Sequence, residues 1–149
     1  MKYIFFAFTL LFLLSCQKEP PGFGPVKSKI ELLVNKKWQT TGISVKLADG
    51  TVIPNFLSTL PEEEKDDYYF YRPDLTFEIN DNILKKEGSS SDILQTGSWS
   101  LFNSDLQMTS DDSAYIFYPV KIIELTEDKL KIQISHNGDI QYRTFKVIF

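Results

Sequence analysis

The sequence contains one cysteine, Cys16, and one histidine, His136. Without a second thiol, a disulfide framework, a thiolate zinc site and a catalytic thiol with a cysteine partner are all excluded. His136 precedes Asn137 and Gly138, a pair typical of tight hairpin turns, so it is expected to be a turn residue. Motifs of serine hydrolases and phosphate-binding loops are also missing. We therefore predict a non-enzymatic protein that uses no metal and no cofactor.

The chain also lacks an excess of positive charge and a long apolar segment. Its 16 basic and 20 acidic residues give a formal net charge of −4, which removes the electrostatic basis for binding nucleic acid. The longest uncharged apolar run, residues 3–14, would cover about 18 Å as a helix. A membrane-spanning helix needs roughly 20 residues. This run is therefore too short to be a membrane span.

The N-terminus instead has the pattern of a secretory signal, because Lys2 precedes the apolar run and the small residue Ser15 follows it. Leu13, Leu14, Ser15 and Cys16 resemble the bacterial lipobox. That resemblance implies that residues 1–15 are a lipoprotein signal peptide and that Cys16 becomes the lipidated first residue, anchored in a membrane. An unmodified lone thiol is the alternative.

Residues 16–26 are predicted to be a lipidated tether, since proline and glycine dominate the stretch and disfavour helix and strand. Gln17, Lys18 and Glu19 resemble an export signal for outer-membrane lipoproteins of some Gram-negative bacteria. The expected location is the outer membrane, facing either the cell surface or the periplasm. The expected partners are that membrane and an envelope protein or small hydrophobic ligand.

Residues 27–149 are predicted to form one all-β domain with a short N-terminal helix. Aromatic and β-branched residues alternate with polar ones along most of this stretch, which favours strands. We predict a helix over 27–35 and a short helix that is capped by Thr59 and ends at Lys65. We also predict eight strands, over 38–46, 68–72, 75–80, 95–101, 106–109, 115–126, 129–135 and 140–149. Short connections between so many strands favour an eight-stranded antiparallel up-and-down barrel. A two-sheet sandwich is the alternative.

The strand over 68–72 is the best indication of a binding site. Because strand side chains alternate, Tyr69 and Tyr71 point to one face while Tyr68 and Phe70 point to the other. One aromatic pair can therefore line a cavity, and Trp99 is expected to join it. The alternative is ordinary strand packing, with the tyrosine hydroxyls reaching solvent.

Several stretches of the sequence together carry the pattern of a known family: the lipobox, residues 33–38 at the end of the predicted helix, and the strands and turns at residues 66–70, 73–77, 97–100 and 123–130. With these stretches the chain resembles the small lipocalin-like lipoproteins of Gram-negative bacteria. This resemblance implies a lipocalin-like barrel. It also implies that Arg143, from the last strand, covers Trp38 at the base of the barrel in a cation–π contact.

Two functions are consistent with these patterns. The first is a binding protein that holds a small apolar or aromatic ligand in the barrel, and the second is a protein-interaction or accessory lipoprotein with a filled barrel. A cavity of at least ~300 Å³ would favour the first function. Asp112, Ser113 and Ala114 also resemble the acceptor sequence for protein O-glycosylation in some of these bacteria.

Overall fold

The computed structural model describes residues 26–88, 90–103, 105–112 and 120–149. Cys16, Ser113 and the predicted signal peptide lie outside these residues, as do residues 16–25 of the predicted tether and residues 115–119 of the predicted strand over 115–126. The elements in chain order are α1 (Lys29–Leu33), β1 (Lys37–Lys46), β2 (Val52–Ile53), the 3₁₀ turn η1 (Phe56–Thr59), α2 (Glu62–Lys65), β3 (Tyr68–Tyr71), β4 (Thr76–Asn80), β5 (Ile93–Phe102), β6 (Asp105–Ser110), β7 (Val120–Leu125), β8 (Lys129–His136) and β9 (Asp139–Ile148).

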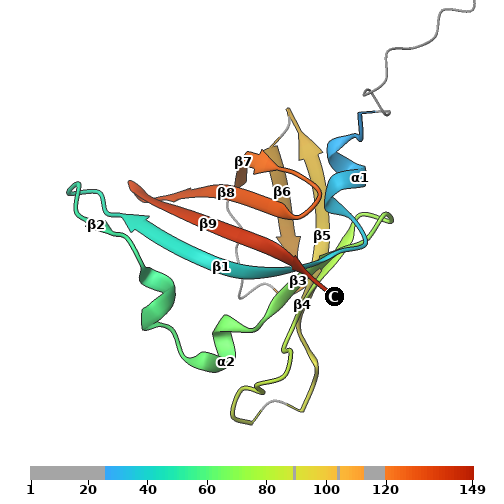
Figure 1. Ribbon diagram of the computed structural model, residues 1–149, viewed down its shortest axis with the longest axis horizontal. Coiled ribbons are helices and arrows are strands. Elements are labelled where there is room, and N and C mark those ends of the chain that lie inside the picture. Colours follow the sequence, from blue (N-terminus) through green and yellow to red (C-terminus); the bar gives the residue numbers. More distant parts are fainter. Residues whose placement is uncertain (1–25, 89, 104, 113–119) are drawn as a thin grey trace, which may run out of the picture.

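The strands form a closed antiparallel sheet. β9 returns to pair with β1 from the Lys37–Ile148 pair to the Lys46–Ile140 pair, and the two strands run side by side in Figure 1. β2 pairs with β1 through only two residue pairs, so the ring consists of β1 and β3 to β9. The predicted eight-stranded up-and-down barrel is therefore confirmed, and the sandwich is excluded.

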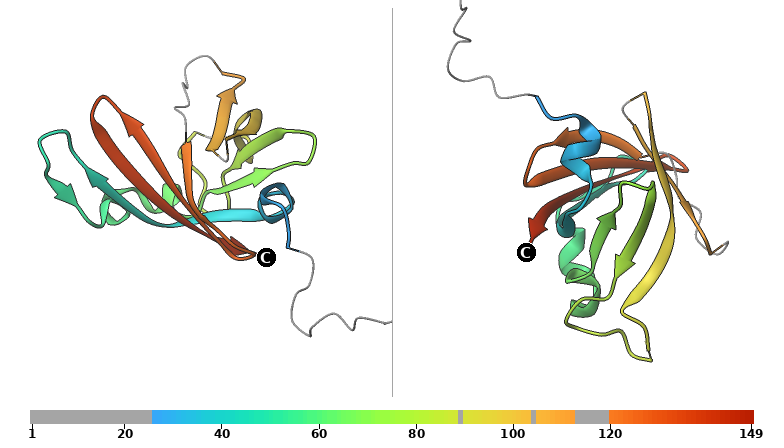
Figure 2. Two further views of the ribbon diagram at one scale, coloured as in Figure 1. Left: turned by 90° about the horizontal axis from the view of Figure 1, so that it is seen from above. Right: turned by 90° about the vertical axis from the view of Figure 1, so that its right-hand side faces the viewer.

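The helix α1 lies beside the end of the barrel where β1 begins (Figure 2). Ser28 and Glu31 form a capping box that starts the helix. Leu33 is fully buried, and its carbonyl accepts a hydrogen bond of 2.8 Å from Trp38 Nε1. The helix is shorter than the predicted 27–35, because Val34 is already extended and Asn35 has a φ of 58°. These contacts close one end of the barrel.

The buried side chains come from alternate strand positions. Trp99 is buried in β5, whereas its neighbours Ser98 and Ser100 are exposed. Gly97, also buried, lies against the ring of Phe77, where a larger residue would not fit. The buried apolar side chains form one cluster, with Leu33, Trp38, Tyr71, Phe77, Trp99, Leu106, Leu130 and Phe145 among its members. The period of two therefore sets which residues form the core.

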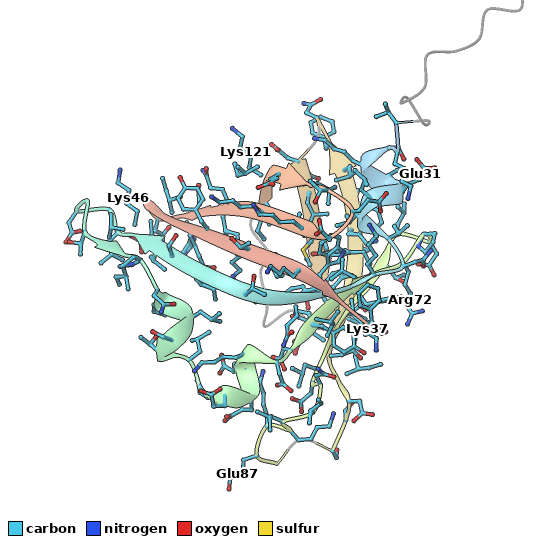
Figure 3. All side chains as sticks on the ribbon, viewed as in Figure 1. Glu31, Lys37, Lys46, Arg72, Glu87 and Lys121 are labelled. Carbon is cyan, nitrogen blue, oxygen red and sulfur yellow. The ribbon has the colours of Figure 1, made fainter. Side chains whose placement is uncertain are left out.

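The opposite end of the barrel carries the β8–β9 hairpin and the loop between β4 and β5. His136 pairs with Asp139, and Asn137 and Gly138 have φ values of 50° and 90°. Two successive positive φ angles are those of a tight hairpin turn, which confirms that His136 borders a turn. Figure 3 shows Glu87 projecting from the β4–β5 loop, away from the sheet.

The segment between β2 and β3 differs in detail from the sequence prediction. The sequence predicts that Thr59 caps a short helix, but the Thr59 hydroxyl donates to the carbonyl of Phe56 within η1. Pro61 occupies the cap position of α2 and makes no side-chain cap hydrogen bond. The predicted cap is wrong because Thr59 already completes the preceding 3₁₀ turn. The helix itself is confirmed, ending at Lys65.

Candidate ligand-binding site

A cavity of about 510 Å³ lies inside the barrel. Most of its wall is apolar and comes from Val45, Tyr69, Tyr71, Ile79, Met108, Val120, Ile132, Ile134 and Phe145, while Gln95, His136, Asp139, Gln141 and Arg143 supply polar atoms. His136 and Asp139 border the β8–β9 turn, which places the mouth at the end opposite α1. Lys46 marks this end of β1 in Figure 3, and Lys37 marks the closed end. The volume lies within the roughly 300–1,000 Å³ typical of small-molecule sites.

Tyr69 and Tyr71 point into the barrel and contribute to the cavity wall, on the face that they were predicted to share. Tyr69 packs edge-on against Phe145, with ring centroids 5.3 Å apart. Tyr71 lies deeper: its side chain is fully buried, and its hydroxyl contacts Met108 Sδ at 3.6 Å. Burial raises the pKa of the Tyr71 phenol well above its usual value, so the phenol stays neutral.

The other two aromatic residues of β3 lie outside the barrel. Lys37 Nζ lies 5.1 Å from the ring centroid of Tyr68, and the Arg72 guanidinium lies 5.1 Å from that of Phe70. The long cationic side chains therefore cover the two outer rings, whereas Tyr69 and Tyr71 line the cavity.

Trp99 does not line the cavity, contrary to the sequence prediction. Its ring packs edge-on against Tyr71 with centroids 5.9 Å apart, and its Nε1 donates to the Arg72 carbonyl at 3.1 Å. Only 3% of its surface is exposed. Trp99 thus supports Tyr71 from behind, since β5 carries it toward the closed end while the cavity lies toward the mouth.

Arg143, in the middle of β9, has its side chain inside the barrel. Its Nε donates to Gln141 Oε1 at 2.7 Å, and its Nη1 donates to the Tyr69 hydroxyl at 2.9 Å. Both partners are neutral. The guanidinium is therefore the principal positive group in a cavity whose walls are mostly apolar.

The expected cation–π contact of Arg143 with Trp38 is wrong. In the β1–β9 pairing Trp38 lies opposite Val147, whereas Arg143 lies opposite Ile43. Arg143 and Val147 are four positions apart, or about 13 Å along the strand, which is beyond the reach of the side chain. Lys36 Nζ lies over the Trp38 ring instead, 5.6 Å from its centroid. Lys36 also forms an ion pair with Glu127, so it joins the connection between α1 and β1 to the β7–β8 turn.

A second recess of about 200 Å³ adjoins the main cavity. The two share Tyr69, Ile79, Gln95 and Arg143, and the recess extends from there beneath η1 and α2. Lys86, from the β4–β5 loop, forms an ion pair of 3.0 Å with Asp67 at its wall. Arg143 and Tyr69 therefore stand between the two spaces, where atoms in either one can reach them.

Asp67 is a carboxylate in an unfavourable environment. Burial raises the pKa of Asp67, and the nearby Lys86 ammonium offsets only part of this effect. Its Oδ1 is buried and has no hydrogen-bond partner among the described residues. One oxygen of Asp67 is thus paired while the other is only desolvated, which favours the protonated form.

Arg143 was not predicted to be a cavity residue. The available signal was the period of β9: Gln141, Arg143 and Phe145 occupy alternate positions and face the same side. Phe145 indicates the direction of this series, because an apolar residue in a strand with one solvent-exposed face points toward the interior. Gln141 and Arg143 then point inward as well. Assigning Arg143 to the base of the barrel masked this pattern.

Neither a membrane-spanning helix nor a metal site is found among the described residues. No helix among them is both long and apolar enough to span a membrane. Residues 26–88, 90–103, 105–112 and 120–149 also contain no group of three histidine or carboxylate side chains placed to hold a metal ion.

The chain matches a known protein family. Residues 34–132 match the model of the lipocalin-like domain, and this segment spans about two thirds of the chain. It runs from the end of α1 into β8 and includes most of the barrel. No curated protein matches the chain significantly.

Proposed function

The chain belongs to the lipocalin-like domain family, and we propose that it is a binding protein holding a small apolar or aromatic ligand inside its barrel. The observation that carries the proposal is the cavity of about 510 Å³. A barrel of eight strands can be filled by its own side chains or can hold one small ligand. The alternative accessory function rests on a filled barrel, and the size of this cavity favours binding.

The lining of the cavity supports an apolar ligand. Aliphatic side chains such as Ile132 and Ile134 line the cavity together with Tyr69, and a ligand that covers them removes apolar surface from water. Each Å² so buried contributes roughly 25 cal/mol. No catalytic role is proposed, because His136 borders the β8–β9 turn, where its Nε2 lies 2.9 Å from the side-chain amide of Asn137.

We also propose that the protein is a lipoprotein of the outer membrane. Cleavage before Cys16 and acylation of its thiol would leave residues 16–26 as a tether between the membrane and α1. Intact-mass analysis of the protein extracted from membranes tests this proposal. The expected species begins at Cys16 and carries the acyl chains, whereas a soluble species with an unmodified Cys16 would refute it.

Binding in the cavity is tested with N-phenylnaphthylamine, a neutral dye that fluoresces in apolar surroundings. The assay uses chains that carry C16A, so that no acyl chain binds the dye. I134W places a large ring at the cavity wall and should weaken dye binding at least about 10-fold, which corresponds to about 1.4 kcal/mol. I123W, on β7, makes the same substitution at a position that is 44% exposed and serves as the control. Equal affinity of the two variants would refute binding inside the barrel.

A further inference from the structure

Arg143 has a charge that the surrounding residues do not balance. A guanidinium carries five N–H donors, and Gln141 and the Tyr69 hydroxyl accept two of them. Within the described part of the chain, Arg143 forms no ion pair. A partly buried charge that lacks an ionic partner is costly, so its retention inside an apolar barrel requires a reason.

The carboxylates that line the same two spaces are committed elsewhere. Asp139 lies four positions from Arg143 on β9, about 13 Å along the strand, and its Oδ1 accepts from the amide of Ala48 at 2.8 Å. Asp67 is paired with Lys86. Glu64 is exposed on α2. None of the three neutralises the guanidinium.

From this arrangement we infer that the ligand is an organic anion with an apolar body, and that Arg143 together with the Tyr69 hydroxyl binds its acidic group. This inference rests on the proposed binding function and specifies its ligand class. The Tyr69 oxygen accepts from Arg143, which leaves its own hydrogen free to donate to an anion. Donors from β9 and β3 thus converge on one point, where an acidic oxygen can receive charge-assisted hydrogen bonds.

The surroundings of this point fit the remainder of such a ligand. Phe145 packs edge-on against Tyr69 and fixes the ring that carries the hydroxyl. Beyond it, Met108, Val120 and Ile132 form apolar wall on the side of the cavity away from the recess. An acid placed at Arg143 therefore extends its body along apolar surface and away from the ion pair of Asp67 and Lys86.

The test compares two dyes of nearly the same shape: anilinonaphthalene sulfonate, an anion, and N-phenylnaphthylamine, which is neutral. Both are titrated into the C16A chain and into C16A chains carrying R143Q or R72Q. The quantity measured is the ratio of the neutral dye's Kd to the anion's Kd. Because both dyes report on the same cavity, this ratio is insensitive to a partial loss of folded protein.

R143Q should lower this ratio at least about 10-fold while the Kd of the neutral dye changes less than about 2-fold. R72Q is the matched control, because it removes the same charge from the outside of the barrel, where Arg72 pairs with Glu78 and points outward (Figure 3). It should leave the ratio unchanged. Competition by dodecanoate, but not by dodecanol, should likewise depend on Arg143.

A ratio that is the same in R143Q and in the parent chain would overturn the inference, and so would an equal loss in R72Q. In either case the proposed binding function would still stand if the neutral dye binds tightly and I134W weakens that binding. Failure of both dyes to respond to I134W would overturn both the binding function and the ligand class.

Discussion

Replacing Gly97 with alanine is expected to destabilise the barrel strongly. A Cβ atom at this position would lie 2.1 Å from the carbonyl oxygen of Thr109 and 2.6 Å from Cε1 of Phe77. The first contact is with the backbone of the paired strand β6, which cannot move without disturbing the β5–β6 ladder. The second is with the fully buried ring of Phe77, which packs against Tyr71 with ring centroids 6.4 Å apart.

The size of the effect follows from these contacts. Overpacking in a core costs about 1–3 kcal/mol, and a weakened ladder hydrogen bond adds about 1 kcal/mol. Because G97A meets obstacles on two sides, we expect a loss of about 3 kcal/mol, which is a large part of the roughly 5–15 kcal/mol that stabilises a typical domain. For a chain of this length the loss lowers Tm by roughly 6–12 °C.

Urea unfolding followed by tryptophan fluorescence measures the effect, since Trp99 lies two residues from the substitution and Trp38 lies in the same core. G42A is the matched control. Its Cβ would meet Thr144 Cβ at 3.7 Å, an ordinary contact, so its stability should change by less than about 1 kcal/mol. If G97A unfolds at the same urea concentration as G42A, the steric argument is refuted.

Two further predictions concern the turn and the buried carboxylate. N137A should cost about 1 kcal/mol because Asn137 has a φ of 50°, whereas N137G should be neutral; equal Tm values for the two variants would contradict this. The raised pKa of Asp67 means that its carboxyl binds more protons in the folded state than in the unfolded state. The contribution of Asp67 to the unfolding free energy therefore falls as the pH rises from 3.8, the ordinary pKa of the carboxyl, through the raised pKa. D67N should remove that decline, which is measured by urea unfolding of both proteins at about pH 4 and about pH 7. If the unfolding free energy of the wild type instead rises relative to that of D67N between these pH values, the prediction is wrong.

Much of the fold could be predicted from local patterns. Alternation located the strands of the ring, although the start of the predicted strand over 115–126 lies outside the described residues. Asn137 and Gly138 identified the last hairpin because few residues accept positive φ angles. The ends of α1 and the cap of α2 could not be predicted in the same way. They depend on which of several possible hydrogen-bond partners a side chain takes. The Thr59 hydroxyl, for example, donates to the Phe56 carbonyl within η1 and does not cap α2.

The candidate site was predicted only in part. The period of β3 placed Tyr69 and Tyr71 on one face, but which aromatic pair faces inward depends on how the sheet closes. Trp99 looked equally suited to a cavity wall and lies behind it instead. The partner of Trp38 was misassigned because resemblance indicates which residue types are present, whereas strand register sets the distance between them.

The sequence by itself determined that the domain is all-β and where most of its strands and turns lie, because alternation and turn residues act over a few neighbouring positions. Only the tertiary structure decided that the barrel keeps a cavity, that Arg143 stands inside it beside Tyr69, and that Lys36 covers Trp38. These features depend on the register between β1, β3 and β9, strands that are far apart in the chain. Pairing across such distances is fixed by the packing of the whole core, which no local pattern contains.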